Sequence, residues 1–411
     1  MKTSNISYPL GFLGISIINT LFTQWIVYYH AEKGLHSGTI IGVGTVLFVG
    51  YVFQGILSPL IGHWVDHNRL NRKKIILLAT FPLAAIFYSL FKATSFYISA
   101  PLMLLFNLFF VLMIQPYMSL LPTIEPDKDR RVIFSLIGAL LAVGGAILAL
   151  SIAPIMLNKF SFDGISWMGA IALIGAVWVP ILFITNPHQT YAKGDTASFS
   201  RAFLKFSRKV YGKRPVRLFL LGNGMTFIVV QAMTILTPFV SNNVLGKDST
   251  FTLNLNIALS VGMLASTITL IVFSKKLDML KLQAFLTKLC SIVLFFLCVS
   301  TLLLEADTLV VIWVIAYGLL GAIVLGAMVC PPLILSQFND EDPGGNEGLL
   351  FGLNGFGINV GNAIASQVVA LLLFHHIGGD TEKQVLYVLV FALLAAIISA
   401  ISLHEASRKN K

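Results

Sequence analysis

Long apolar runs, separated by short polar segments, make up almost the whole chain. Each run reaches about 20 residues, the length that an α-helix needs to cross the hydrocarbon core of a bilayer. The pattern therefore predicts an all-α membrane protein. The twelve predicted transmembrane helices lie near 8–30, 39–63, 73–92, 96–121, 132–157, 165–186, 217–242, 251–274, 281–304, 308–335, 348–375 and 384–403.

A polar and basic segment separates the sixth run from the seventh. Within it, Phe199, Phe203 and Phe206 recur at helical spacing and predict an amphipathic helix over 198–211. Such a helix would lie on the inner leaflet, with its basic residues at anionic headgroups. The predicted parts are a six-helix bundle at 1–186, a cytoplasmic linker at 187–216 and a second six-helix bundle at 217–411.

Two short motifs of the first half recur in the second. Gly62-x-x-x-Asp66, followed by basic residues, has an echo that ends at Asp278, and Pro116, followed by an acidic pair, has an echo at Pro331. Both motif pairs are consistent with a single duplication of one half of the chain. The alternative is that such short motifs match by chance. Parallel halves of this kind place a substrate site near the bilayer midplane, between the two bundles.

Composition excludes a soluble protein. Charged residues make up 11% of the chain, whereas soluble domains carry about 25%. The net charge of +10 fits positive-inside topology better than nucleic-acid binding. If the N-terminus is cytoplasmic, the outer loops hold only five of the 28 Lys and Arg residues, namely Lys33, Lys92, Lys159, Lys247 and Lys383. This asymmetry predicts a multi-pass protein of the plasma (inner) membrane with both termini in the cytoplasm.

The end of the second run carries a recognisable turn. Gly62-x-x-x-Asp66 and its basic cluster resemble the signature that follows the second helix of the major facilitator superfamily, with His67 in place of an arginine. Three stretches are similar to the glycoside–pentoside–hexuronide cation symporters, the subfamily of the melibiose carrier. They are SPLIGHWVDHNR (58–69), PYMSLLPTIEPDKDRR (116–131) and NEGLLFGLNGFGINVGNAIAS (346–366).

The subfamily's charged residues are missing here. The resemblance aligns its two acidic cation ligands of the second helix with Gln54 and Ser58, and a basic residue of the eleventh helix with Asn359. Its acidic sugar-binding residue of the first helix falls at or near Ser16, and 132–157 lacks the sugar-contacting arginine. Anions and cation are absent together, which is coherent because a lone charge in a membrane interior is costly. The departure disfavours sodium coupling.

Amides, hydroxyls and aromatic side chains recur at helical spacing in several runs. Tyr51, Gln54 and Ser58, for example, share one helix face. Such groups either line a substrate pathway or hold helices together, the latter at about 0.6 kcal/mol each. The candidate substrate-binding residues are Ser16, Asn19, Thr23, Gln24, Tyr51, Gln54, Ser58, Asn107, Gln115, Asn223, Gln231, Tyr317, Asn359 and Asn362, with Ser366 continuing the last face.

Charged residues near the predicted inner ends suggest a gate. Asp66 lies at the end of the second helix, where a carboxylate can accept hydrogen bonds from a neighbouring helix N-terminus. Basic residues beside it would bridge to inner-side acids and break on inward opening. The alternative is a solvated charged loop. The candidate gating residues are Gly62, Asp66, Arg69, Arg72, Lys73, Asp127, Arg131, Asp278, Asp342 and Glu347.

The sequence shows no nucleophile–base motif, phosphate loop or metal spacing, so we predict no enzyme activity, no cofactor and no metal. The favoured function is a secondary transporter that moves a small organic solute by alternating access, with cation coupling in doubt. Proton-coupled efflux of an amphiphilic compound and a non-transporting receptor on a carrier fold are the alternatives. The expected partners are a small-molecule substrate and membrane lipids, not nucleic acid, and a monomer is expected.

Overall fold

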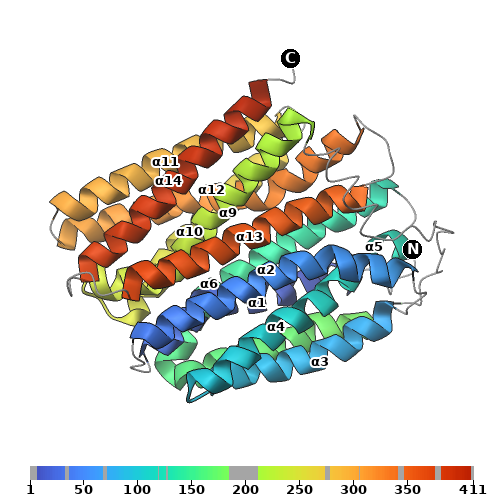
Figure 1. Cartoon of the computed structure of the whole chain (residues 1–411), viewed down its shortest axis with the longest axis horizontal. Coiled ribbons are helices and arrows are strands. Elements are labelled where there is room, and N and C mark those ends of the chain that lie inside the picture. The colour runs from blue at the N-terminus through green and yellow to red at the C-terminus, as the bar shows by residue number, and fades with distance from the viewer. Residues whose placement is uncertain are drawn as a thin grey trace. The chain divides into compact units, whose positions relative to one another are not determined.

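Every regular element in the described part of the chain is helical (Figure 1). The structure is a computed structural model. It describes residues 7–32, 37–67, 72–118, 120–125, 128–184, 212–273, 278–304, 306–340, 347–374 and 381–408.

The helices follow the apolar runs closely. The first half contains α1 (Leu10–Glu32), α2 (Ser37–His67), α3 (Arg72–Leu90), α4 (Phe96–Met118), α5 (Leu121–Ile124), α6 (Lys128–Leu173), the π-helical turn η2 (Ile174–Trp178) and α7 (Val179–Phe183). The second half contains α9 (Arg214–Phe239), η3 (Val240–Val244), η4 (Ser249–Phe251), α10 (Thr252–Phe273), α11 (Met279–Leu303), α12 (Ala306–Asp340), α13 (Glu347–Phe374) and α14 (Thr381–Arg408).

The observed apolar helices can be matched to the twelve predicted transmembrane helices. Nine helices of the described residues are long and apolar enough to cross a bilayer, and two shorter apolar stretches, Thr252–Ser266 and Thr308–Val324, belong to α10 and α12. One of the nine, Leu140–Phe183, covers two predicted spans, because the chain turns at Ser161 inside α6 with φ 54° and ψ −158°. The prediction of an all-α membrane protein is confirmed.

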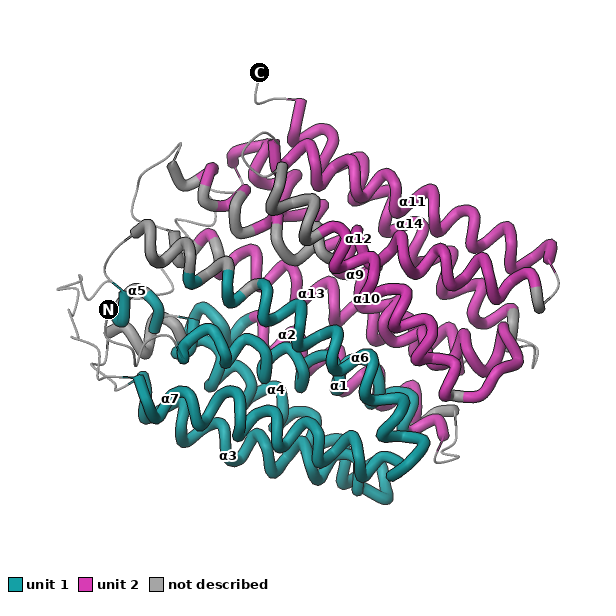
Figure 2. Tube along the Cα trace, turned by 180° about the vertical axis from the view of Figure 1, so that it is seen from behind, with its two compact units in different colours: residues 1–29, 56–199 teal, residues 30–55, 200–411 magenta. Residues whose placement is uncertain are grey.

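The chain forms two compact units (Figure 2). Unit 1 comprises residues 1–29 and 56–199, and unit 2 comprises residues 30–55 and 200–411. The division at 199/200 falls inside the predicted linker 187–216, whose amphipathic helix lies outside the described residues. The sequence assigned residues 30–55 to the first bundle, whereas the structure groups them with the second.

Close approach to α13 explains why the first half of α2 belongs to unit 2. A Cβ added at Gly44 would lie 2.5 Å from the Cβ of Ala370, and one added at Gly55 would lie 3.2 Å from the Cβ of Asn359. Two glycines on one side of α2 thus let its backbone settle against α13. Small residues at helix contacts are the usual means of close packing in membranes.

Aromatic rings hold unit 1 together. Phe22 of α1 stacks on Phe106 of α4 with ring centroids 4.1 Å apart. Tyr29 of α1 meets Phe162 of α6 edge-on at 4.8 Å, and its hydroxyl donates to the carbonyl oxygen of Ala93 at 2.8 Å. These contacts fix α1 against α4 and against the part of α6 that follows the turn.

In unit 2, α10 and α12 pack with their backbones in direct contact. A Cβ added at Gly262 of α10 would overlap the carbonyl oxygen of Gly318, and one added at Gly321 of α12 would overlap that of Leu259. Both overlaps involve backbone atoms, which cannot rotate away. The two helices therefore require glycine at these positions.

Candidate functional site

Three buried polar side chains of unit 2 meet from three helices. The Gln231 amide nitrogen on α9 donates to the Ser366 hydroxyl on α13 at 3.0 Å and lies 3.4 Å from the Tyr51 hydroxyl on α2. Tyr51, Gln231 and Ser366 are exposed by only 3%, 5% and 0%. We name these residues the amide–hydroxyl cluster. Two of them, Tyr51 and Gln231, were predicted as substrate-binding residues.

The contact of α2 with α13 positions two further candidates. Gln54 is buried one turn beyond Tyr51, so the two residues share a face of α2. It precedes Gly55, which packs against Asn359. The Asn359 amide nitrogen donates within its own helix, to the carbonyl oxygen of Gly355 at 2.9 Å. Asn359 and its neighbour Asn362 are half-buried.

An aromatic pair on α12 adds a second polar contact to α9. The Tyr317 hydroxyl donates to the Thr237 hydroxyl at 3.1 Å, and the Tyr317 ring lies 5.9 Å from that of Trp313. Trp313 is fully buried, and its indole N–H has no hydrogen-bond partner in the part of the chain that the structure describes. A buried donor without a partner is rare. Trp313 was not among the predicted residues, although its i, i+4 spacing to Tyr317 can be read from the sequence.

The interior of the described helices is almost free of charge. Among the buried polar side chains of the described residues, Glu125 and His30 are the only ones with a carboxylate or an imidazole, and the others are amides and hydroxyls. Glu125 follows α5 outside the long helices, and His30 lies near the end of α1. The buried hydrogen-bonding groups inside these long helices are therefore neutral, apart from His30 near the end of α1.

A second polar set, also in unit 2, contains one predicted residue and two missed ones. The Asn223 amide nitrogen on α9 donates to the Asn354 amide oxygen on α13 at 2.8 Å, and the Asn223 amide oxygen accepts from the Gln283 amide nitrogen on α11 at 3.0 Å. We name these residues the amide triad. Both ends of the Asn223 amide serve helix contacts, which is the alternative role that the sequence left open. Gln283 and Asn354 are isolated amides in apolar runs, so no spacing singled them out.

The other predicted binding residues lie in unit 1. The Asn107 amide nitrogen donates to the Met103 carbonyl oxygen at 2.9 Å, inside α4. The burial of the rest varies: Thr23, Gln24 and Ser58 are buried, Ser16 and Gln115 are half-buried, and Asn19 is exposed. Their role in substrate binding stays a prediction.

Two predicted gating residues stabilise helix ends. Asp278 caps α11, where its carboxylate accepts from the backbone N–H groups of Leu280 and Lys281 at 3.1 and 3.2 Å and lies 3.0 Å from the Lys281 ammonium. Burial alone would raise the pKa of Asp278, but the hydrogen bonds from the Lys281 ammonium and the two backbone N–H groups outweigh it and lower the pKa. The Lys73 ammonium donates to the carbonyl oxygens of Leu182 and Ile184, both at 2.8 Å, at the end of α7.

Most of the predicted gate is not among the side chains that the structure describes. Arg72 is half-buried at the start of α3. Gly62, Asp66, Arg69, Asp127, Arg131, Asp342 and Glu347 lie outside the residues whose side chains are described.

Comparison with known proteins identifies the family of this chain and solved structures with a similar fold. A family model described as Major Facilitator Superfamily matches residues 6–366. A D-xylose–proton symporter is similar with a TM-score of 0.72 and 14% identity, over 97% of this chain and 96% of that chain. The nucleoside transporter NupG (TM-score 0.67, 14% identity, 98% and 99% covered) and a structure from the proton dependent oligopeptide transporters (0.68, 15%, 100% and 100%) are also similar. At such low sequence identities, the similarity to these structures shows a shared fold only.

Proposed function

The chain belongs to the major facilitator superfamily, and from that premise we propose that it moves a neutral small organic solute by alternating access without sodium. As a member of that superfamily it is a multi-pass membrane transporter of a small solute and not an enzyme. The solute's chemistry and the absence of ion coupling are the proposed part.

The amide–hydroxyl cluster is the observation that carries the proposal. Gln231, Tyr51 and Ser366 offer both donors and acceptors from three helices, and none of them carries a charge at neutral pH. Such groups bind hydroxyl- and amide-bearing molecules and give no advantage to an ionised one. Tyr317 and Trp313 form a buried aromatic pair on α12. The similar structures bear names of D-xylose and nucleoside transporters, and both of these solute classes fit this chemistry.

The proposal places the protein near the glycoside–pentoside–hexuronide cation symporters, but without their cation site. Gln54 and Ser58 stand where the resemblance puts two acidic ligands, and both are buried. Asn359, at the aligned basic position, uses its amide nitrogen within α13. Sodium is held by oxygen ligands, among which carboxylates supply the compensating charge. A set of two neutral side chains gives the ion no such compensation.

The charge distribution supports the proposed orientation. Basic residues concentrate in the segments that face inward when the N-terminus is cytoplasmic. We therefore place both termini on the cytoplasmic side of the inner membrane.

Flux into proteoliposomes tests the proposal. The purified full-length protein is reconstituted, and uptake of a pentose, a hexose, a nucleoside and a dipeptide is followed with equal ion concentrations on both sides. We expect saturable uptake of one class to equilibrium, with no acceleration by an inward sodium gradient. Uphill accumulation driven by sodium would overturn the uncoupled mechanism, and failure of all four classes would overturn the proposed solute chemistry.

A matched pair of serine variants tests the cluster. Ser366→Ala removes one of the two hydroxyls that accept from the Gln231 amide nitrogen, whereas Ser291→Ala removes a hydroxyl that donates to the Thr287 carbonyl oxygen inside α11 at 3.0 Å. We expect Ser366→Ala to raise the KM of uptake about fivefold, the effect of one hydrogen bond of about 1 kcal/mol. Ser291→Ala should transport like the wild type. Equal KM values for both variants would remove the amide–hydroxyl cluster from the pathway.

A further inference from the structure

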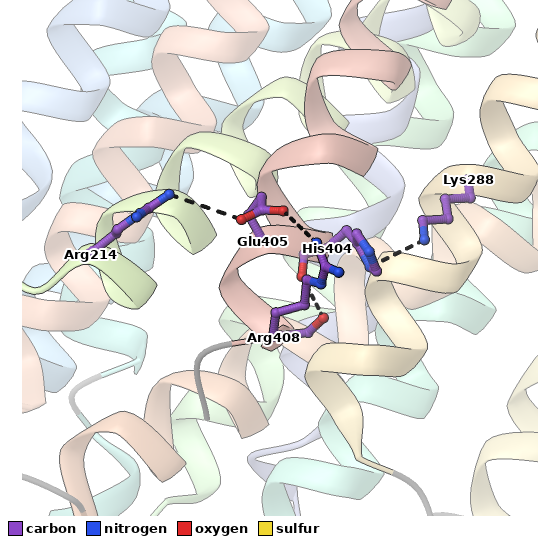
Figure 3. A network of polar contacts seen from close by, with 6 residues as sticks. Arg214, Lys288, His404, Glu405 and Arg408 are labelled. Atoms are coloured by element: carbon purple, nitrogen blue, oxygen red, sulfur yellow. Dashed lines mark hydrogen bonds and ion pairs between the residues drawn. The ribbon is translucent and has the colours of Figure 1, made fainter. Parts of the chain in front are cut away.

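A group of basic residues surrounds the end of α14 in unit 2 (Figure 3). The Lys288 ammonium on α11 lies 3.2 Å from the Nδ1 atom of His404. Glu405 points toward Arg214 of α9 at 4.0 Å, and Arg408, one turn beyond His404 and Glu405 on α14, lies 3.4 Å from the same carboxylate. We name Arg214, Lys288, His404, Glu405 and Arg408 the α14 basic network.

The network borders an apolar, exposed face of α11 and α14. Phe285 and Ile292, one turn to either side of Lys288, are 61% and 52% exposed, and Ile401, one turn before His404, is 60% exposed. In a membrane-spanning helix such a face contacts acyl chains. Lys288 lies nine residues into α11, about 14 Å along its axis. Its long side chain can carry the ammonium toward the headgroup level.

The charges of the network do not cancel. The network holds three cations, Arg214, Lys288 and Arg408, but only one carboxylate, that of Glu405, which Arg214 and Arg408 both contact. Lys288 contacts a ring nitrogen instead of an acid. An ammonium has three N–H donors and no acceptor atom, so the contact with Nδ1 of His404 uses at most one of them. No carboxylate of the described residues forms an ion pair with Lys288.

We propose that the α14 basic network binds the phosphate of an anionic phospholipid headgroup. The Lys288 ammonium and the Arg408 guanidinium would donate to the phosphate oxygens, while the acyl chains lie along the apolar face beside Phe285 and Ile401. Because the basic residues lie beside an exposed apolar face, a lipid fits the site better than a free phosphate ion, which has no apolar part. With both termini in the cytoplasm, the site faces the inner leaflet, where anionic lipids attract basic residues.

Thermal unfolding of the full-length protein in neutral detergent tests the site. Phosphatidylglycerol is titrated into the micelles, with phosphatidylcholine and inorganic phosphate as separate arms. A ligand that binds only the folded state raises Tm. We expect phosphatidylglycerol to raise Tm and the other two to leave it unchanged. An equal shift with phosphatidylcholine or with inorganic phosphate would overturn the proposal.

Variants of matched charge locate the site. Lys288→Gln should raise the half-saturating concentration of phosphatidylglycerol about fivefold, which corresponds to about 1 kcal/mol per basic residue at the membrane surface. Lys281→Gln, which removes a lysine of the same helix that pairs with Asp278, should titrate like the wild type, and Lys288→Arg should keep the shift. If Lys288→Gln does not fold, Arg408→Gln takes its place with the same expected loss. An unchanged titration, or an equal loss in Lys281→Gln, would refute the site.

Discussion

Replacing Asn223 by alanine tests whether the amide triad joins helices or faces the substrate. The Asn223 amide nitrogen and oxygen are bonded to Asn354 and Gln283 at 2.8 and 3.0 Å, and none of the three residues is more than 8% exposed. The variant removes both interhelical hydrogen bonds at once. It also leaves a buried donor on Gln283 and a buried acceptor on Asn354 without their partner.

The size of the effect follows from these contacts. Interhelical side-chain hydrogen bonds in membranes contribute about 0.6 kcal/mol each and at most about 1.7 kcal/mol, so two give about 1 to 3 kcal/mol. An unsatisfied buried group adds about 1 kcal/mol or more. The Gln283 amide oxygen already lacks a partner among the described residues. With two such groups, on Gln283 and Asn354, we expect Asn223→Ala to lower the free energy of unfolding by about 3 to 5 kcal/mol.

Two measurements on the same protein separate the roles. Unfolding in mixed detergent and denaturant gives the loss of stability, and uptake into proteoliposomes gives the KM of the fraction that folds. A structural triad predicts a KM within about twofold of the wild type. Asn107→Ala serves as the stability control, because the Asn107 amide nitrogen donates within its own helix at 2.9 Å. It should cost less than about 1 kcal/mol.

Wild-type stability together with a KM raised tenfold or more would refute the helix-contact role and return Asn223 to the substrate pathway. The double variant Asn223→Ala with Gln283→Ala sharpens the test. If the two amides interact directly, their effects on the free energy of unfolding should be less than additive by about 0.6 to 1.7 kcal/mol.

Three further outcomes follow from the structure. Tyr51→Phe should raise the KM of uptake about fivefold by removing a cluster hydroxyl, whereas Tyr29→Phe, whose hydroxyl donates to a backbone carbonyl of unit 1, should lower Tm and leave the KM unchanged. Gly321→Ala should destabilise the protein by about 1 to 3 kcal/mol, because its Cβ overlaps the α10 backbone, and Gly144→Ala, with nothing within 4 Å, should not. Asp278→Ala should cost about 1 kcal/mol at pH 7 as a lost N-cap. Since the pKa of Asp278 is lowered on folding, that difference in stability should be complete above the ordinary pKa of 3.8 and be lost as the pH falls through the lowered pKa of the folded state; a difference that grows as the pH falls would contradict the carboxylate's role.

The helices could be predicted from the sequence because their signal is local. A run of about 20 apolar residues can cross a bilayer in only one way, as a helix that satisfies its own backbone. α13 was predicted at 348–375 and observed at Glu347–Phe374, and α11 at 281–304 and Met279–Leu303. The turn at Ser161 falls in the gap predicted between the fifth and sixth spans.

The groupings of residues depend on tertiary contacts and could not be predicted in the same way. Helical spacing placed Tyr51 and Gln54 on one face of α2, but nothing in the sequence indicated that Gly44 and Gly55 bring this half of the helix against α13. Helical spacing likewise cannot tell which amides bond a neighbouring helix. The structure shows that Asn223 bonds two of them, α11 and α13.

The two polar sets of unit 2 also differ in how readily their bonds can be exchanged. In the amide triad both contacts are 3.0 Å or shorter. In the amide–hydroxyl cluster the Gln231 nitrogen is shared between a contact of 3.0 Å and one of 3.4 Å to Tyr51, and the longer contact is weak. A solute hydroxyl that replaces it exchanges one neutral hydrogen bond for another. Because none of the three side chains is charged, the empty site needs no cation to neutralise it before the carrier changes conformation. Net flux without an ion gradient is the transport mode that this arrangement favours.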